Sequence, residues 1–334
     1  MAGVKKLRRV QLGLETNKGT AVAATAQWRG PGEFTDGREV IIPDEDVGYL
    51  VAVDRGYSPK LAAGFELQEI PATFEQLAYP FSAGVADVVA GVANGGTSDG
   101  YKYAYTAPTT AAPTTKAYTF EGGDNQQAYE YEYSVCKEIN LSGKPGEAVM
   151  VSSSWFARQE SKTTFTGSLT PPTVEEILFQ KGKLYCDAVG GTLGATQLTN
   201  TWLGFDLKII TGLIPVFTGD GNLYYSFEKC IGPEITGSFT FEHDAVGVAR
   251  KDDFVALTAK KFRMLFLGSA LAGSGGTFTT KAAQLDLVAK LTSVDPIGEV
   301  NGNDILKINY KVVYNSTASL YFVTTICNLL ATLP

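Results

Sequence analysis

The sequence predicts a mainly β protein made of two tandem β-sandwich domains, each with a short helix and an extended hairpin. Three observations support this prediction: a composition rich in strand and turn residues, segments in which apolar and polar residues alternate, and an internal repeat. The 334 residues exceed what one compact core needs, and a hydrophobic fraction of 44% is ample for two cores.

The composition favours strands over helices. Tyr, Phe, Gly and Thr are abundant, whereas long runs of Leu, Ala, Glu and Lys are missing. Aromatic and β-branched side chains pack well on a pleated sheet, and glycine serves the turns between strands. We therefore expect several short strands joined by turns, which is typical of a β-sandwich.

An internal repeat relates the two parts of the chain. The segments SPKLAAGFELQEI (58–70) and GPEITGSFTFEHD (232–244) share a proline, an aliphatic residue two places later and a phenylalanine six places after the proline. The same offset of 174 residues superimposes Trp28 on Trp202. It also places the alternating Val10, Leu12 and Leu14 on Leu184, Cys186 and Ala188. A shared offset in a constant order indicates a duplicated domain.

Each copy is expected to contain one short helix after the repeated segment. TFEQLA (73–78) matches DFVALT (253–258), and both open with a residue that favours the helix N-cap. In the first copy Thr73 and Gln76 form a capping-box pattern, and Pro80 is expected to close the helix early. Apolar residues follow at helical spacing, namely Phe74, Leu77, Ala78 and Phe81.

Alternating strands are expected to end each copy. In the first copy these are YEYEYSV (129–135), with its tyrosines on the core face, and GEAVMVSSSWFARQ (146–159). In the second copy QLDLVAKLT (284–292) and DILKINYKVVYN (304–315) occupy the equivalent places.

The predicted domains are 1–168 and 169–334. Pro171 and Pro172 stop the preceding strand, and Thr173 with Glu176 is expected to cap a short helix leading into the second domain. An insert at 91–119, rich in Gly, Ser, Thr, Ala and Pro, is expected to form a long exposed loop or hairpin.

Few residues are available for catalysis. The chain has one histidine, His243, no phosphate-binding loop and no nucleophile elbow, so we predict that it is not an enzyme and needs no cofactor or metal. The acidic runs 44–46 and 252–253 are read as solvated turns, because the full calcium-loop pattern is missing. Four widely separated cysteines, Cys136, Cys186, Cys230 and Cys327, are expected to be free thiols.

The net charge and the two ends of the chain bear on partners. A charge of −7 argues against a nucleic-acid grip based on phosphate neutralisation. No segment reaches the roughly 18 apolar residues of a membrane-spanning helix, and the N-terminus lacks the apolar region of a signal peptide. The N-terminal cluster is either a solvated tail or an arm that docks on an acidic neighbouring subunit; its basic residues are Lys5, Lys6, Arg8 and Arg9. The apolar C-terminal segment (319–334) must be tucked against the chain, exposed, or buried against a partner.

Several long stretches resemble one protein family. RRVQLGLETNKGTAVAATAQWRG at the start, PATFEQLAYPFSAGV, GGDNQQAYEYEYSVCKEINLSGKPGEAVMVSSSWFARQ, and the closing INYKVVYN and VTTICNLLATLP are similar to siphophage major tail tube proteins. The resemblance covers nearly the whole chain and is one of pattern and order. It implies a β-sandwich whose hairpins join those of neighbouring subunits into a continuous barrel around a lumen, with rings that stack into a tube.

The resemblance also implies location and partners. The subunit would be made and assembled in the host cytoplasm, reside in the virion tail, and contact itself, a tape measure protein, and the tail terminator and tail tip proteins. Family rings use six tube domains, so a chain with two copies predicts three chains per ring with pseudo-sixfold symmetry. If the second copy is instead a decorating domain, the ring holds six chains.

An acidic lumen wall would let DNA pass without phosphate contacts. Glu130, Glu132 and Asp286 are the candidates for this wall; the alternative is that they lie on an outward solvated face. The competing interpretation of the whole chain is an extracellular β-sandwich module that binds carbohydrate or another surface ligand. It predicts a monomer with a ligand groove and an isolated aromatic platform.

Overall fold

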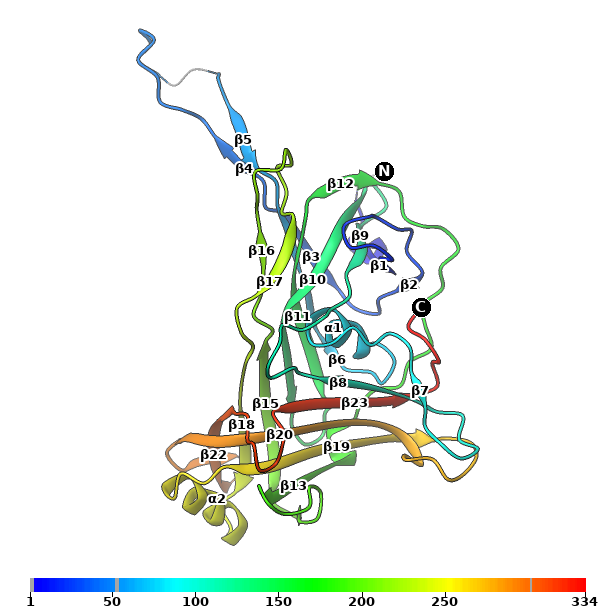
Figure 1. The fold of residues 1–334 in the computed structure, drawn as a ribbon, viewed down its shortest axis with the longest axis vertical. Coiled ribbons are helices and arrows are strands. Elements are labelled where there is room, and N and C mark those ends of the chain that lie inside the picture. Colours follow the sequence, from blue (N-terminus) through cyan, green and yellow to red (C-terminus); the bar gives the residue numbers. More distant parts are fainter. Residues whose placement is uncertain (1–2, 52–53, 301) are drawn as a thin grey trace.

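The computed structural model describes residues 3–51, 54–300 and 302–334, and it confirms the prediction of a mainly β fold (Figure 1). We call residues 1–168 the N-half and residues 169–334 the C-half. The N-half contains η1 (Lys5–Leu7), β1 (Arg9–Leu14), β2 (Ala26–Gln27), β3 (Gly32–Asp36), β4 (Glu39–Ile41), β5 (Tyr57–Lys60), β6 (Ala63–Pro71), α1 (Ala78–Gly84), β7 (Val92–Ala93), β8 (Tyr101–Thr106), β9 (Tyr118–Gly123), β10 (Ala128–Gly143), β11 (Met150–Ala157) and β12 (Glu160–Thr163).

The C-half repeats much of this order. It contains η2 (Phe179–Lys181), β13 (Gly182–Ala188), β14 (Gln197–Leu198), β15 (Trp202–Ile210), β16 (Leu213–Val216), β17 (Phe227–Cys230), β18 (Glu234–Glu242), α2 (Ala245–Val255), β19 (Lys260–Ala270), β20 (Thr280–Val294), β21 (Gly298–Val300), β22 (Asn303–Val312) and β23 (Phe322–Asn328).

The two halves share a pattern of antiparallel strand pairing. In the N-half, β9 lies between β1 and β10, and β10 also pairs with β12. In the C-half, β19 lies between β13 and β20, and β20 also pairs with β23. A second series runs β3–β6–β11–β10 in the N-half and β15–β18–β22–β20 in the C-half. Each half is therefore a pair of sheets that share one long strand.

Aromatic side chains fill the space between the sheets of each half. In the N-half, Phe120 on β9 lies 4.6 Å from Phe65 on β6 and 5.0 Å from Trp155 on β11, measured between ring centroids. In the C-half, Phe239 on β18 lies 5.0 Å from Phe262 on β19. These rings are buried because successive side chains of a strand point to opposite faces, and the apolar members of each alternating pattern point inward.

The helices differ in detail from the prediction. Thr73 Oγ1 does accept a hydrogen bond from the Gln76 amide (3.2 Å), but α1 begins only at Ala78. Pro80 therefore lies inside the first turn of α1, where its missing N–H has no helical partner to lose. In the C-half, Asp244 is the N-cap of α2 and accepts from the Gly247 amide, so the predicted start at Asp253 was wrong.

The structure also differs from two predictions for the connecting segments, a helix in the linker and an exposed loop or hairpin at 91–119. No helix forms at Thr173–Glu176; the segment is extended, and Thr73 forms a β-bridge with Glu176. Within the 91–119 insert, β7 and β8 form a short hairpin, and β8 also pairs with β23 from Val323↔Thr106 to Asn328↔Tyr101. Tyr103 and Tyr105 on β8 are fully buried, because they form part of the core and not of an exposed loop.

The C-terminal segment is tucked against the N-half. The Leu333 amide donates to the Val89 carbonyl (2.8 Å), and Tyr103 Oη donates to the Leu330 carbonyl (2.6 Å). The four cysteines are free thiols; Cys136, Cys186 and Cys327 are buried, whereas Cys230 is partly exposed. In the part of the chain that the structure describes, no helix is long and apolar enough to cross a membrane.

Candidate self-assembly interface

The two halves are joined edge to edge through β10 and β15. These strands pair antiparallel from Glu138↔Ile210 to Gly143↔Phe205. Ile139 and Leu141 on β10 and Leu207 on β15 point into the core and are at most 2% exposed. The result is one continuous sheet in the order β3–β6–β11–β10–β15–β18–β22–β20.

The strand at each end of this sheet has one edge without a hydrogen-bonded partner strand. Among the described residues, β3 pairs only with β6, and Lys290–Val294 of β20 pair only with β22. The matching stretch of β10 in the N-half has β11 on one side and β15 on the other. The end strand β3 corresponds to β15, and the end strand β20 corresponds to β10. The two free edges therefore belong to the counterparts of the two strands that pair at the internal junction. A free strand edge carries unpaired N–H and C=O groups and is a template for pairing with another chain.

The charges at the free edges are opposite in sign. At the internal junction, Lys208 of β15 forms an ion pair with Glu138 of β10 (3.0 Å). At the free edges, Glu33 and Asp36 are exposed on β3, and Lys290 is exposed on β20. Arg38 lies 3.6 Å from Asp36 and offsets its charge, so the complementary charges at the two edges are those of Glu33 and Lys290.

The hairpin β16–β17 fastens the junction by packing on the N-half. Leu213 and Tyr225 are buried in a cluster with Tyr133, Val135 and Phe156 of the N-half. The Glu228 carboxylate accepts hydrogen bonds from Lys18 Nζ and Tyr133 Oη.

Arg158 of the N-half strengthens the same contact. Its Nε donates to the Tyr225 carbonyl (3.1 Å) and its Nη2 donates to the Ser226 carbonyl (3.3 Å), while the guanidinium also lies over the Tyr133 and Tyr224 rings. Apolar burial, charge-assisted hydrogen bonds and cation–π contacts thus hold the hairpin against the N-half.

The segment that links the halves is bound into the N-half by its backbone. The Ile177 amide donates to the Ala72 carbonyl (2.8 Å), and the Ile177 carbonyl accepts from the Val149 amide (2.7 Å). Ile177 is buried, so the linker acts as an added strand between the two N-half segments.

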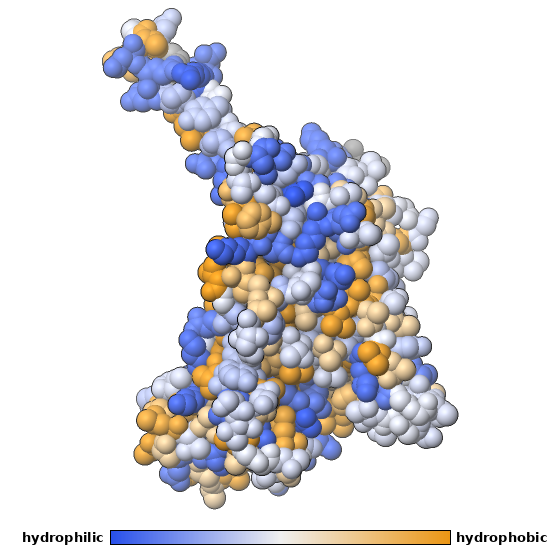
Figure 2. All heavy atoms as spheres, in the orientation of Figure 1, coloured by the Kyte–Doolittle hydropathy of each residue, from blue (hydrophilic) through white to orange (hydrophobic). Residues whose placement is uncertain are grey.

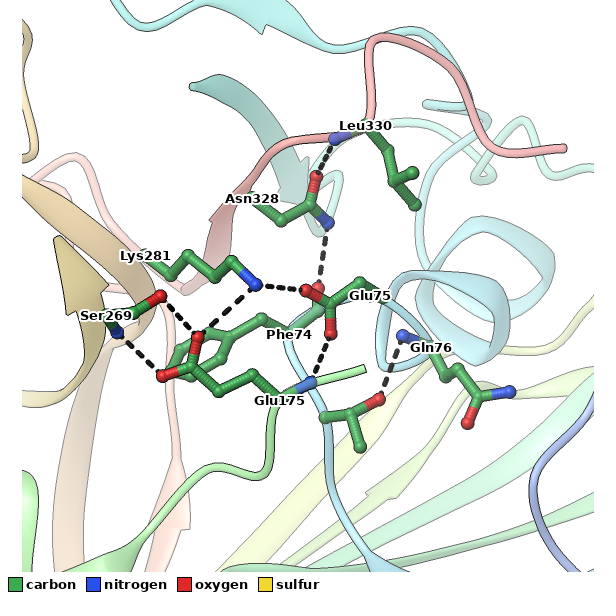
Figure 3. A network of polar contacts seen from close by, with 9 residues as sticks. Phe74, Glu75, Gln76, Glu175, Ser269, Lys281, Asn328 and Leu330 are labelled. Carbon is green, nitrogen blue, oxygen red and sulfur yellow. Dashed lines mark hydrogen bonds and ion pairs between the residues drawn. The ribbon is translucent and has the colours of Figure 1, made fainter. Parts of the chain in front are cut away.

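A charged network fixes the linker to the C-half (Figure 3). Lys281 Nζ of β20 lies 2.7 Å from Glu75 Oε1 and 3.3 Å from Glu175 Oε2. Glu75 also accepts from the Glu175 amide (2.9 Å), and Glu175 accepts from the amide and hydroxyl of Ser269 (2.6 Å each). Lys281 therefore connects a turn of the N-half, the linker and a strand of the C-half.

The pKa values of Glu175 and Lys281 are shifted toward the charged forms. Burial alone would raise the pKa of Glu175, but the Ser269 hydrogen bonds and Lys281 outweigh it and leave the pKa below its ordinary value. Burial alone would lower the pKa of Lys281, but Glu75 and Glu175 raise it above its ordinary value. Glu175 and Lys281 are therefore both charged at neutral pH.

The predicted basic arm lies beside the free edge of β3. Lys5 and Lys6 belong to the short helix η1, and Arg9 starts β1 with its guanidinium 4.9 Å from the centroid of the Phe165 ring. Lys5, Arg8 and Arg9 line a groove of about 930 Å³, together with Glu33, Phe34, Asp124, Tyr129, Tyr131 and Glu160. Residues 1–2 of the arm lie outside the described part.

The counterpart of η1 in the C-half is η2, since both directly precede the first strand of their half and lie 174 residues apart. The linker containing η2 is bound into the N-half, as described above. The N-terminal arm with η1 therefore has the same position relative to the N-half as the linker with η2 has relative to the C-half. In the C-half, this position is that of the segment that connects the two halves.

The structure does not bring the three predicted acidic residues together. Glu130 and Glu132 are partly buried on the N-terminal part of β10, which pairs with β9 and β12. Burial, with Glu132 next in effect, raises the pKa of Glu130. Asp286 is 8% exposed and is held by Arg263 through two hydrogen bonds of 2.7 and 2.8 Å. The charge of Asp286 is thus largely offset.

The sequence analysis did not predict that the continuous sheet has one polar face. This face carries the residues that alternate with the buried ones: Glu66, Gln68, Asn140, Ser142, Ser152, Ser154, Asp206, Lys208, Thr236, Lys307 and Asn309. A shallow depression of about 260 Å³ lies on it between Glu69 and Thr236. The signal was present as polar–apolar alternation in segments such as GFELQ and LKINY, but only the sheet order shows that they form one face.

No constellation for chemistry accompanies these features in the described ranges. His243 is exposed just after β18, and no group of three or more His, Cys, Asp or Glu side chains is placed to hold a metal ion. Neither a family model nor a curated protein matches this chain.

Proposed function

We propose that this chain is a structural subunit of a siphophage tail tube, which assembles with copies of itself into rings that stack into a hollow conduit for DNA. The observation that carries the proposal is the continuous sheet with complementary free edges. Its internal junction is heterologous, since β10 of one half meets β15 of the other. Repeating such a junction between copies produces a closed ring when the rotation closes.

The shared strand pattern supports two tube domains per chain. Three chains would then supply six domains, with pseudo-sixfold symmetry, and closure would leave no free sheet edge in the ring. The polar face of the sheet would line the lumen, and its ion pairs, including Lys208–Glu138 and Lys307–Asp206, limit the free positive charge available to phosphates.

The remaining parts of the proposal rest on the family resemblance. The tube would lie in the virion tail, be assembled in the host cytoplasm, and meet a tape measure protein and the terminator and tip proteins. Glu130 and Glu132 stay candidates for additional negative charge along the DNA path. Asp286 is the weakest of the three because Arg263 neutralises it.

Native mass spectrometry and electron microscopy of the purified chain test the proposal. Hollow rings or tubes with three chains per ring are expected. Rings of six chains would keep the function but assign the C-half a decorating role. A monomer that never polymerises on concentration or warming would refute the proposal.

Charge reversal tests the edge pairing. The double change Glu33→Lys and Asp36→Lys should weaken assembly by repulsion from Lys290, and adding Lys290→Glu should restore part of it. Glu147→Lys in an exposed loop is the matched control. Equal assembly of all variants would exclude this edge as the contact.

Deletion of residues 1–9 tests the arm. The expected result is a folded chain that still forms rings but stacks them poorly, seen as short tubes. Undiminished tube length would rule out an arm role in stacking.

A second candidate function has one observation in its favour. The groove beside β3 contains Phe34, Tyr129 and Tyr131, which is compatible with a carbohydrate-binding module. However, the Tyr131 side chain is 1% exposed, and Phe34 stacks on it at 4.7 Å between ring centroids. The rings therefore offer little free face for stacking on a sugar. Binding of the monomeric protein to a glycan array would favour this second function.

A further inference from the structure

The hairpin β4–β5 projects from the body of the protein (Figure 1). None of the described residues between Glu39 and Lys60 is buried. Several large apolar side chains are exposed along it, including Val40 (66%), Ile42 (62%), Tyr49 (73%), Leu50 (103%) and Tyr57 (51%). Figure 2 shows hydrophobic and hydrophilic spheres interspersed on this projecting end of the molecule. Such a surface is typical of an interaction site.

The counterpart of this hairpin is β16–β17. The hairpin β4–β5 connects β3 to β6, and β16–β17 connects β15 to β18, the matching strands of the C-half. The hairpin β16–β17 is not free, because Leu213, Tyr225 and Glu228 pack on the N-half as described above. The hairpin β16–β17 therefore packs on the neighbouring half. The hairpin β4–β5 contacts its own chain at its base, where Lys60 Nζ lies 4.5 Å from the centroid of the Phe217 ring and the Leu61 amide donates to the Leu223 carbonyl (2.9 Å), but none of its described residues from Val40 to Tyr57 is buried.

The surface of the N-half that binds β16–β17 is formed by two segments. One is the segment directly before β9, where Ala117 joins the buried cluster, and the other is the end of β11 with Phe156 and Arg158. Tyr118 and Phe156 pair with the adjacent residues Ser134 and Val135 of β10.

Two matching segments exist in the C-half. Lys260 of β19 and Val312 of β22 both pair with Ala289 of β20. The segment directly before β19 exposes Leu257 (71%), and Tyr314, two residues after the end of β22, is 53% exposed. The C-half thus has largely exposed apolar side chains near the places that bind β16–β17 in the N-half.

We infer that the hairpin β4–β5 of one copy docks on the Leu257–Tyr314 surface of a second copy of this chain. The inference rests on the proposed function, because it requires neighbouring copies. The occupant follows from the match between the halves: the structure shows this kind of docking once, as the contact of β16–β17 with the N-half, and a second copy of the chain supplies a hairpin at the matching place. This contact between two chains would have the same arrangement as the contact of β16–β17 with the N-half within one chain.

Site-directed crosslinking tests the contact. In a Cys230→Ala background, one protein carries Val40→Cys or Tyr57→Cys and a second carries Leu257→Cys. The two proteins are disassembled, mixed, reassembled and treated with a short bismaleimide. A crosslinked dimer containing one chain of each kind is expected. Val92→Cys, at an equally exposed apolar residue (69%), replaces the hairpin cysteine as the control and should give no such product.

A second experiment measures how substitutions in the proposed contact change assembly. Leu257→Asp with Tyr314→Asp should raise the concentration needed for assembly at least tenfold by sedimentation, whereas Val92→Asp should leave it unchanged. Rings of normal mass without crosslinks from either hairpin position would overturn this inference and leave the proposed function intact. A wild-type chain that stays monomeric would overturn both.

Discussion

Removing the Lys281 ammonium should destabilise the protein strongly. In Lys281→Met the apolar stem is kept, but the carboxylates of Glu75 and Glu175 lose their cation. The side chains of Lys281 and Glu75 are only 12% and 8% exposed, so water compensates poorly. Removing one partner of a buried pair costs about 3–5 kcal/mol, because the remaining charge stays desolvated.

This loss converts into a shift of melting temperature. Unfolding entropy of about 2.1 cal/mol/K per residue gives about 0.7 kcal/mol/K for this chain of 334 residues. The expected decrease in Tm is therefore about 4–7 °C at pH 7, measured by differential scanning calorimetry. Lys144→Met is the matched control, because Lys144 forms an exposed pair with Glu147 (3.2 Å) that contributes about 0–1 kcal/mol.

The effect should depend on pH in a defined direction. The pKa of Glu175 is lowered in the folded state, so its contribution is present above the ordinary value of 4.5 and is lost as the pH falls through the folded pKa. The pKa of Lys281 is raised, so its contribution persists at neutral pH and is lost only above its ordinary value of 10.5. The Tm difference should shrink below pH 4.5. A difference of less than 1 °C at pH 7, or one that grows in acid, would refute this account of the network.

Two further predictions concern the helix cap and the hairpin. Asp244→Ala removes the acceptor for the Gly247 amide and should cost about 1 kcal/mol in a thermal melt, whereas Asp252→Ala on the exposed side of α2 should change stability little. Arg158→Ala should speed amide hydrogen exchange in the hairpin β16–β17, because charge-assisted bonds worth about 1.5–3 kcal/mol are lost. Unchanged exchange there would show that apolar packing alone holds the hairpin.

The sequence by itself determined the strand content and the residues that face the core. Alternation in 129–135 and 304–315 marks two central strands, because a strand presents every second side chain to one face. Phe65 and Phe239, which the 174-residue offset superimposes, are both buried, on β6 and β18.

Only the tertiary structure decided features that depend on partners far away in the chain. The insert was predicted to be exposed because the partner that buries β8 is β23, more than 200 residues later. The linker does not form the helix that Thr173 and Glu176 suggested, since the N-half satisfies its backbone groups as an added strand.

The charge of a candidate site was likewise decided by pairing across strands. Asp286 was predicted from its own strand alone, but register places it opposite Arg263, which neutralises it. The free edges of β3 and β20 follow from sheet order, and sheet order follows from which non-local strands pair. Local sequence determines which residues a strand can bury, and the rest of the fold determines which edge each strand leaves open.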